Sequence, residues 1–461
     1  MVVVYVYRRK CYEKLLEWKR RSQGKTAVLV EGARRVGKTT LVREFAAREY
    51  DAYIYIDFSK ASNDILSLFR DQRSDVDTFL RMLQLITGVL LERRRGVVIF
   101  DEVQRFPIAR EYVKHLVADG RFDYIETGSL ISIKKNVESI VIPSEEERVT
   151  LDPLDFEEYL WAAGLDIYAE EIRQRYAALQ PLEDAVHRRI ERHFNEYMLV
   201  GGMPQSVEAF LEDADFRGCD RVKRHIISLY MEDMVKFGGG DARRARAIFQ
   251  EIPGELSAVS KRFKFADVQS DGRYETFESA FIWLEDAHLV NICRLCTDPS
   301  VGYRLHADET ALKCYMADTG LLVSWAFGDG PESLDVHRDI QLGRVSINKG
   351  MLVENAVAQQ LHASGHSLFY YSWQEPSKKE GAKPRPREVD FLITRGFADA
   401  AGKLRICPVE TKSSKTYSTV SLDDFGRRFR ERTGDELVLH PKNVRVEGRR
   451  RCLPLYMAHL L

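Results

Sequence analysis

Apolar residues form short uninterrupted runs in the first third of the chain, and between these runs they recur every three or four positions. Uninterrupted runs predict buried strands, whereas the wider spacing predicts helices with one apolar face. The predicted strands are residues 27–30, 53–58, 96–102 and 124–127, and the predicted helices are residues 12–20, 40–47 and 75–91. This alternation predicts an α/β fold in which helices cover both faces of a parallel sheet.

The middle of the chain has a helical pattern with many charged residues. Residues 172–237 show helical spacing, and three consecutive glycines at 238–240 then mark a hinge or domain boundary. Further predicted helices, at residues 243–255, 258–263 and 274–288, precede a predicted strand at residues 289–295. Helices followed by a short hairpin are typical of a winged-helix-like module. The pattern leaves open whether such a module contacts DNA or protein.

The last quarter of the chain again mixes helix and strand. Residues 350–361 predict a helix, and residues 388–393 and 406–412 predict strands. A chain of 461 residues is expected to hold about three domains. We therefore predict domains at residues 1–165, 166–340 and 341–461, the last of them a separate α/β domain.

Composition narrows the class of protein. Hydrophobic residues make up 44% of the chain and charged residues 30%, as in ordinary soluble proteins. No apolar run approaches membrane-spanning length, so we expect no membrane contact. The seven cysteines are an odd number spread along the chain, which favours a reducing compartment and a cytoplasmic protein. The close pair Cys293 and Cys296 lacks the further ligands of a zinc site and is interpreted as two strand thiols.

The net charge of −1 hides an uneven distribution. Residues 341–461 contain 21 Lys and Arg against 13 Asp and Glu, so they carry an excess of positive charge. Within them, the loop 374–387 and the segment 427–432 are rich in basic residues. A basic region suggests an anionic partner such as DNA, although a solvated basic surface explains the same charges.

A phosphate-binding motif follows the first predicted strand. Residues 32–39 fit the pattern G-x-x-x-x-G-K-[ST], in which glycines let backbone N–H groups surround phosphate oxygens. Lys38 is expected to reach the β- and γ-phosphates, and the Thr39 hydroxyl to bind Mg²⁺. The predicted cofactors are therefore ATP and Mg²⁺. The predicted nucleotide-binding residues are Gly32, Ala33, Arg34, Arg35, Val36, Gly37, Lys38, Thr39 and Thr40.

Carboxylates for hydrolysis come at the end of the third predicted strand. The C-terminal ends of parallel strands meet at the edge of the sheet where ligands bind. We expect Asp101 to hold Mg²⁺ through the water shell of the ion, and Glu102 to orient and polarise the attacking water. At the end of the next strand, Ser129 or Thr127 is the candidate residue for sensing the γ-phosphate. A turn without that role is the alternative.

The order of these motifs resembles that of AAA-type P-loop ATPases. Residues 151–160, 197–204 and 317–322 further resemble a family of prokaryotic ATPases with an uncharacterised C-terminal region. The resemblance implies ATP hydrolysis and a possible homo-oligomer, because AAA-type relatives often take an arginine from a neighbouring subunit. Arg110, Arg121 and Arg148 are all candidates for that arginine, and no motif chooses among them.

The C-terminal domain resembles the PD-(D/E)xK restriction-endonuclease-like core. Its pattern is a helix carrying Glu354, a strand carrying Asp390, and a strand carrying Glu410 and Lys412. Alternation along a strand places Glu410 and Lys412 on one face. The resemblance implies that the three carboxylates bind one or two Mg²⁺ ions and that Lys412 positions or deprotonates a water.

Three functions remain open at this point. In the first, an ATPase fused to a nuclease-like domain acts on DNA. In the second, that domain is non-catalytic and the protein is an ATP-driven switch or scaffold that binds protein or DNA. In the third, the chain is a signalling ATPase with no role on nucleic acid.

Overall fold

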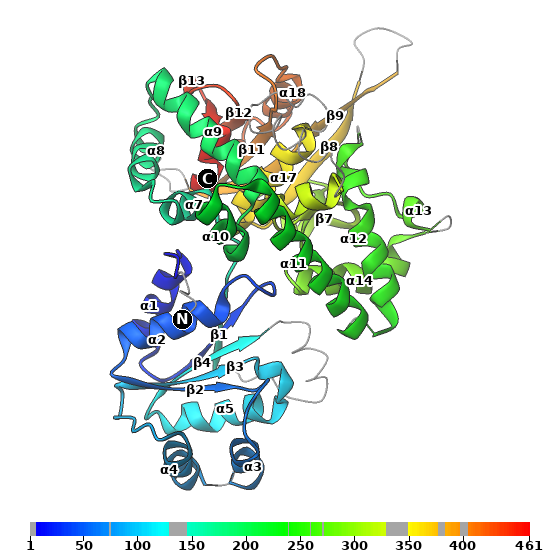
Figure 1. Ribbon diagram of the computed structural model, residues 1–461. Coiled ribbons are helices and arrows are strands. Elements are labelled where there is room, and N and C mark those ends of the chain that lie inside the picture. The colour runs from blue at the N-terminus through cyan, green and yellow to red at the C-terminus, as the bar shows by residue number, and fades with distance from the viewer. Residues whose placement is uncertain are drawn as a thin grey trace. The chain divides into compact units, whose positions relative to one another are not determined.

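The computed structural model describes residues 6–72, 75–128, 145–237, 239–258, 260–269, 272–328, 349–376, 383–396 and 404–461 (Figure 1). The chain forms two compact units. The first unit contains residues Met1–Asp152 with Asp286–His288, and the second contains Pro153–Glu285 with Leu289–Leu461. No helix in the described residues is long and apolar enough to cross a membrane.

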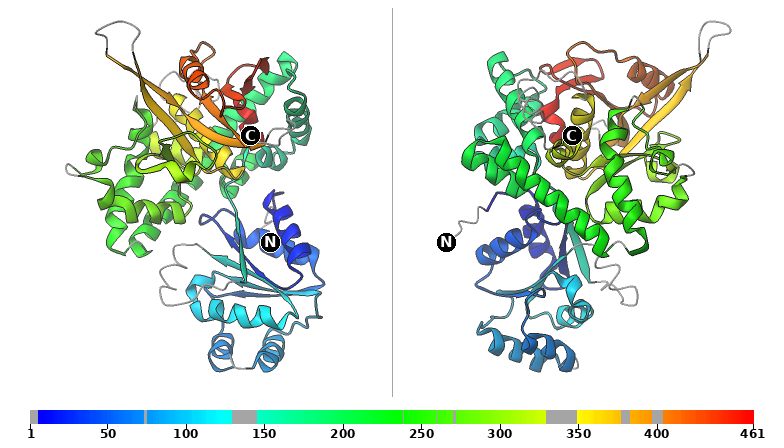
Figure 2. Two further views of the ribbon diagram at one scale, coloured as in Figure 1. Left: turned by 180° about the vertical axis from the view of Figure 1, so that it is seen from behind. Right: turned by 45° about the vertical axis from the view of Figure 1, so that its right-hand side comes forward.

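The first unit is built on a five-stranded parallel sheet in the order β2-β3-β4-β1-β5. Its strands are β1 (Ala27–Glu31), β2 (Ala52–Asp57), β3 (Gly96–Asp101), β4 (Asp123–Gly128) and β5 (Glu146–Thr150). Its helices are α1 (Cys11–Ser22), α2 (Lys38–Glu49), α3 (Asn63–Asp71), α4 (Val76–Thr87) and α5 (Pro107–Asp119), with a short 3₁₀ turn, η1 (Val103–Arg105). Helices α1 and α2 cover one face and α3, α4 and α5 the other (Figures 1 and 2). The predicted parallel α/β fold is confirmed.

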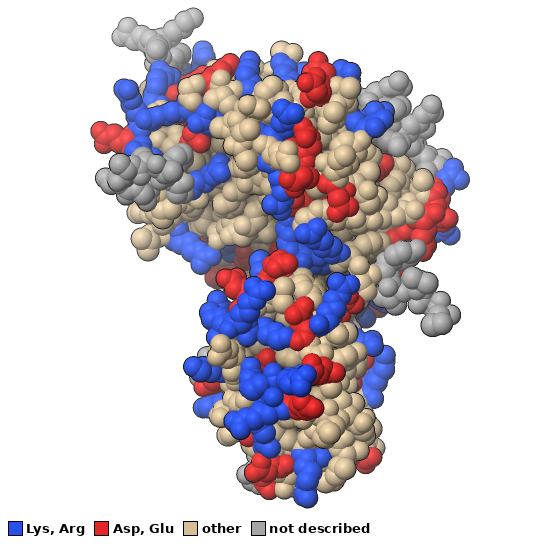
Figure 3. Space-filling model, turned by 90° about the vertical axis from the view of Figure 1, so that its left-hand side faces the viewer, with Lys and Arg blue, Asp and Glu red and all other residues tan. Residues whose placement is uncertain are grey.

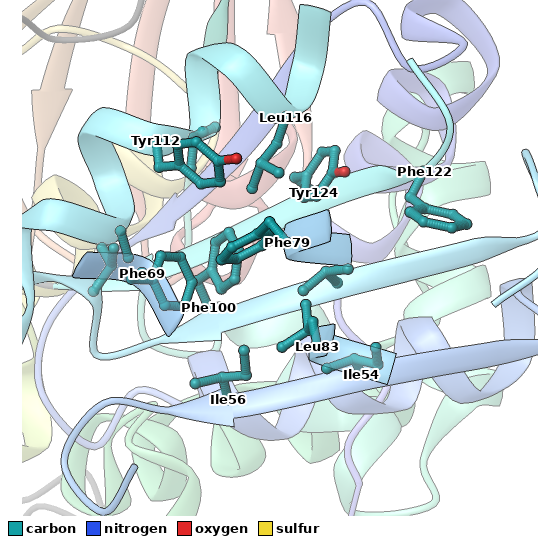
Figure 4. Packing of buried hydrophobic residues seen from close by; sticks show 14 of the residues in the cluster. Ile54, Ile56, Phe69, Phe79, Leu83, Phe100, Tyr112, Leu116, Phe122 and Tyr124 are labelled. Carbon is teal, nitrogen blue, oxygen red and sulfur yellow. The ribbon is translucent and has the colours of Figure 1, made fainter. Parts of the chain in front are cut away.

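Strand alternation decides which side chains of this sheet enter the core. Ile54 and Ile56 of β2 point into a buried cluster that contains Phe69 and Phe79 of the covering helices (Figure 4). Tyr55 lies between these two isoleucines and therefore projects to the opposite face, which α2 covers. The aromatic packing fixes β2 and β3 relative to the helices, so side chains at the ends of these strands have defined positions.

The second unit begins with the predicted helical region. Its helices are α7 (Phe156–Ala162), α8 (Asp166–Ala178), α9 (Asp184–Val200), α10 (Pro204–Asp213), α11 (Phe216–Phe237), α12 (Ala242–Ser257), α13 (Phe265–Val268), α14 (Tyr274–Asp286) and α15 (Thr319–Ala326), with the 3₁₀ turns η2 (Gly239–Asp241) and η3 (Tyr303–His306). The helix predicted at residues 258–263 is wrong. Residues 260–263 are not helical, and the Phe263 N–H donates to the Leu312 carbonyl at 2.8 Å, outside any helical pattern.

Two sheets complete the second unit. One has the order β7-β6-β8-β9 and the other the order β10-β11-β12-β14-β13. The strands of the first are β6 (Val290–Cys296), β7 (Ala307–Met316), β8 (Phe369–Glu375) and β9 (Arg385–Val389). Those of the second are β10 (Phe391–Gly396), β11 (Leu404–Thr411), β12 (Glu436–His440), β13 (Arg445–Glu447) and β14 (Arg450–Pro454). Helices α17 (Lys349–Ala363) and α18 (Val420–Arg428) and the 3₁₀ turn η4 (Leu455–Leu460) pack with them.

The sheet pairing changes how the predicted hairpin is interpreted. Strands β6 and β7 form an antiparallel pair, as predicted for the strands of a winged-helix-like module. However, β6 also pairs in parallel with β8, so the hairpin is part of a larger sheet that continues into the C-terminal region. The single strand predicted at residues 388–393 is divided at Asp390 between β9 and β10, which belong to different sheets.

The segments that carry the family resemblance meet in the interior of the second unit. The Asp318 carboxylate accepts hydrogen bonds from the Gly202 N–H at 2.5 Å and the Leu321 N–H at 2.8 Å. Gln359 of α17 donates to the Tyr197 hydroxyl at 2.9 Å. A Cβ atom at Gly202 would overlap the Leu154 carbonyl oxygen, so only glycine fits there. These residues therefore join distant parts of the second unit.

Candidate functional site

The phosphate-binding loop lies between β1 and α2, as predicted. The backbone φ angle is positive at Gly32 (152°), Arg35 (70°) and Gly37 (102°), which curls the loop. A Cβ at Gly32 would overlap the Leu151 carbonyl oxygen, so this position requires glycine. Of the remaining loop positions, Ala33 and Val36 are buried, Arg34 and Arg35 are exposed, and Thr39 and Thr40 are half-buried.

Lys38 starts α2 and turns its side chain back into the loop. Its Nζ donates to the carbonyl oxygens of Gly32 and Ala33, each at 2.9 Å. Burial lowers the pKa of Lys38, while the nearby carboxylates of Glu102 and Asp101 act against that shift. A desolvated ammonium that faces carbonyl dipoles gains strongly from an anionic ligand. The geometry suits a lysine that contacts a phosphate.

Asp101, at the end of β3, accepts hydrogen bonds from three hydroxyl groups. Thr39 Oγ1 lies 3.1 and 3.0 Å from its two carboxylate oxygens. Tyr55 donates to Oδ2 at 2.6 Å, and Thr127 donates to Oδ1. The two residues predicted to bind Mg²⁺, Thr39 and Asp101, are thus in direct contact. A hydroxyl and a carboxylate supply the oxygen ligands that Mg²⁺ prefers.

Glu102 and the sensor candidates lie at the same edge of the sheet. Glu102 has a left-handed backbone, with φ of 56°, which is uncommon for a residue other than glycine. Its side chain is 38% exposed and accepts a hydrogen bond from Gln104 at 2.7 Å. The Glu102 N–H donates to Thr127 Oγ1 at 3.3 Å, so Thr127 contacts both acidic residues. Ser129 lies outside the described residues.

The three candidate arginines are engaged within the first unit. Arg110 is buried on α5 and pairs with Glu146 of β5 at 2.8 Å. Arg121 bonds to Asp119 and Asp77, both at 2.7 Å. Arg148 lies 3.4 Å from Glu146. Arg110 is only 1% exposed, so it does not reach a nucleotide on a neighbouring subunit.

The predicted nuclease-like residues of the second unit converge on charged partners that sequence reasoning missed. Glu354 of α17 pairs with Lys313 at 3.2 Å and also with Lys261 and the Tyr315 hydroxyl. Lys313 is fully buried on β7, and its Nζ lies 2.7 Å from Glu388. The charge in the otherwise apolar residues 311–316 is the sequence signal that marks Lys313.

The pKa values of the Glu354, Asp390 and Glu410 carboxyl groups are not all shifted in the same direction. Burial would raise the pKa of Glu354, but Lys313 and Lys261 overcome it and lower that pKa to about 2. Burial and the charge of Glu354 raise the pKa of Asp390 to about 7, and Asp390 accepts from the Thr411 N–H at 2.7 Å. Burial also raises the pKa of Glu410, which pairs with Lys412 at 2.9 Å.

The shared metal site expected of Glu354, Asp390 and Glu410 stays a prediction. Among the residues with described positions, no group of three or more His, Cys, Asp or Glu side chains is arranged to hold a metal ion. Lysine ammonium groups pair with Glu354 and Glu410, whereas Asp390 accepts from a backbone N–H. All seven cysteines are buried free thiols.

Three family models match successive parts of the chain. Residues 24–160 match a family described as an AAA domain. Residues 191–332 and 349–457 match families described as domains of unknown function, DUF8612 and DUF4143. The first match covers the parallel sheet, the phosphate-binding loop and the Asp101–Glu102 pair. The first unit is therefore similar to AAA-type P-loop domains.

Solved structures show weak overall similarity. A variant of RuvB from Thermotoga maritima shares 16% identity at a TM-score of 0.28, over 61% of this chain and 87% of that one. The Aeropyrum pernix ORC1 protein in complex with DNA shares 10% identity at 0.26, over 73% and 93%. DnaA from Aquifex aeolicus with bound AMPPCP shares 11% identity at 0.25, over 61% and 90%. No conclusion about function follows from such low scores. No curated protein matches the chain.

Proposed function

We propose that the first unit binds ATP with Mg²⁺ and hydrolyses it. The observation that carries this proposal is the direct contact between Thr39 and Asp101 beside the buried Lys38. The Thr39 hydroxyl and the Asp101 carboxylate would hold Mg²⁺, which would neutralise charge on the β- and γ-phosphates. Gly32–Thr40 supply the backbone N–H groups of the loop, and Lys38 contacts the phosphates.

Glu102 is the proposed group that orients the attacking water. Its side chain is partly exposed and next to Asp101, so it can reach a water that the metal-binding side chains do not hold. Thr127, or Ser129 beyond it, would sense the γ-phosphate, because Thr127 contacts both Asp101 and the Glu102 backbone. We also propose a homo-oligomer in which a neighbouring subunit supplies an arginine. Arg110 is buried in its own ion pair, so the partly exposed Arg121 and Arg148 remain the candidates.

Nucleotide binding tests the role of the loop. Lys38→Ala should abolish tight binding of a fluorescent ATP analogue, because the buried ammonium is lost from the phosphate site. Lys60→Ala is the matched control, since that lysine is 82% exposed and pairs only loosely with Asp57 at 3.5 Å. Undiminished binding by Lys38→Ala would contradict the assignment of the loop.

For the second unit we infer a nuclease-like domain that binds its partner without cleaving it. The specific observation is that Lys313 and Lys261 pair with the two carboxylate oxygens of Glu354, where an active nuclease core would need metal ions. On this proposal the protein is an ATP-driven switch or scaffold. We also propose that residues 166–340 form its helical and winged-helix-like part and residues 341–461 its nuclease-like part, joined by the sheet that β6 and β7 share with β8 and β9.

DNA is the proposed partner because the excess positive charge lies in residues 341–461. Cleavage is tested by incubating the full chain with plasmid and single-stranded DNA in Mg²⁺ or Mn²⁺, beside Asp390→Ala. We expect neither protein to cleave either substrate. Metal-dependent cleavage that Asp390→Ala abolishes would restore the catalytic nuclease and overturn this inference.

A further inference from the structure

Two strands flank β3 in the sheet, and each directs one hydroxyl at the Asp101 carboxylate. In the β2–β3 register Asp57 pairs with Asp101 and Tyr55 pairs with Ile99. A tyrosine two residues before the direct neighbour reaches the carboxylate diagonally across the strands. On the other side, β4 pairs with β3 and carries Thr127.

The two hydroxyls bind different oxygens of the carboxylate. Tyr55 donates to Oδ2 at 2.6 Å, and Thr127 donates to Oδ1. Thr39 then lies about equally far from both oxygens, at 3.0 and 3.1 Å. Hydrogen bonds therefore hold both carboxylate oxygens of Asp101. Both oxygens also face Thr39, the residue that would share the metal ion with Asp101.

The ring of Tyr55 is itself held in place. The guanidinium of Arg43, on α2, lies over the ring at 5.0 Å from its centroid. Burial, followed by the hydrogen bond to Asp101, raises the pKa of Tyr55 well above its ordinary value. The ring and its hydroxyl are therefore held toward Asp101 by contacts from two elements, α2 and β3.

We propose that Tyr55 is a positioning residue for the Mg²⁺ site, acting through Asp101. The torsion that turns a carboxylate about its Cβ–Cγ bond is broad, so an unrestrained Asp101 samples many orientations. Mg²⁺ accepts only near-octahedral geometry and does not adapt to a displaced ligand. The Tyr55 hydroxyl sets the orientation in advance, and Mg²⁺-dependent turnover depends on it. This inference rests on the proposed ATP hydrolysis.

The test compares Tyr55→Phe with Tyr53→Phe in the full chain. Tyr53 lies two positions earlier on β2 and on the same face, so the two variants lose the same atom from neighbouring sites. A hydrogen bond to a charged group corresponds to roughly 10-fold or more in an equilibrium or rate. We therefore expect Tyr55→Phe to lower kcat about 10-fold and to raise the half-saturating Mg²⁺ concentration several-fold. The KM for ATP at saturating Mg²⁺, and the melting temperature, should stay close to wild type, as should all parameters of Tyr53→Phe.

A double-variant cycle distinguishes positioning from general destabilisation. If Tyr55 acts through Asp101, Tyr55→Phe should have no further effect on Mg²⁺-dependent binding of an ATP analogue once Asp101→Asn is present. Additive effects, or a Tyr55→Phe protein with wild-type kcat and Mg²⁺ dependence, would overturn the inference. A wild-type protein without turnover would contradict the proposed function instead, and Tyr55 would then be judged from the Mg²⁺ dependence of analogue binding.

Discussion

Lys313 lies fully buried with its ammonium between the carboxylates of Glu354 and Glu388. Removing one partner of a buried ion pair leaves an uncompensated charge in the interior, which costs much more than the pair contributes. The attraction of Glu354, followed by that of Glu388, outweighs burial and holds the pKa of Lys313 well above its usual range. This one residue therefore supplies positive charge to two carboxylates at once.

We expect Lys313→Met to lower the free energy of unfolding of the second unit by about 3 to 5 kcal/mol. Lys264→Met is the matched control, because Lys264 is 54% exposed and its pairing with Asp267 at 3.7 Å should contribute about 0 to 1 kcal/mol. Denaturant unfolding of both full-length variants measures the difference. If Lys313→Met unfolded with the same free energy as wild type, the carboxylates of Glu354 and Glu388 would not need the Lys313 ammonium to stabilise them.

At the level of single residues, the sequence predicts positions that a local pattern fixes. The loop motif places Lys38 and Thr39 at the start of α2, and the apolar run places Asp101 at the end of β3. Their roles toward ATP and Mg²⁺ stay predictions. Tyr55 and Lys313 were missed, because each meets its carboxylate through strand pairing across the chain and no local pattern records that pairing.

Secondary structure elements were predicted best where one face or both faces are apolar. Strand β3 is buried throughout, and its own sequence is an uninterrupted apolar run that ends at Asp101. Strand β5 was missed because its sequence, Glu-Glu-Arg-Val-Thr, is largely polar and it lies at the edge of the sheet, partly exposed. The separation of β9 from β10 at Asp390 was also missed, since a two-residue alternation continues across a change of sheet.

Gly202, just after α9, packs against Leu154, just before α7, and this contact between two elements can be tested. Gly202→Ala should destabilise the second unit by roughly 1 to 3 kcal/mol, because the added Cβ overlaps the Leu154 carbonyl. Gly218→Ala is the control. A Cβ there has its nearest neighbour at 3.9 Å, and alanine favours helix α11, so that variant should be neutral or slightly stabilised. Thermal unfolding monitored by circular dichroism measures both, and equal melting temperatures would contradict the packing described here.

At the scale of the whole molecule, the distribution of charged side chains decides how strongly an anionic partner such as DNA is attracted. On the face that Figure 3 shows, lysine and arginine side chains lie among acidic ones rather than in one uniform field. The excess of basic residues after residue 340 is thus a property of composition, and the surface on this face mixes both signs. On this face, any attraction to DNA should therefore come from local groups of basic side chains.

If DNA binds, its affinity should fall steeply as salt increases, because phosphate contacts release counterions. Fluorescence anisotropy with labelled single- and double-stranded DNA at several salt concentrations measures the slope. We expect the logarithm of the association constant to fall linearly with the logarithm of salt concentration. A complex that is insensitive to salt would contradict an electrostatic contact with the backbone.

The steady-state rate of ATP hydrolysis by the full chain tests the central claim most directly. Wild type should turn over ATP in a Mg²⁺-dependent manner, and Glu102→Gln should bind ATP as tightly while losing roughly 100-fold or more in rate, since the group that orients the water is lost. Glu92→Gln makes the same chemical change at a carboxylate that is 64% exposed, and it should behave as wild type. Hydrolysis by Glu102→Gln at the wild-type rate would contradict the account.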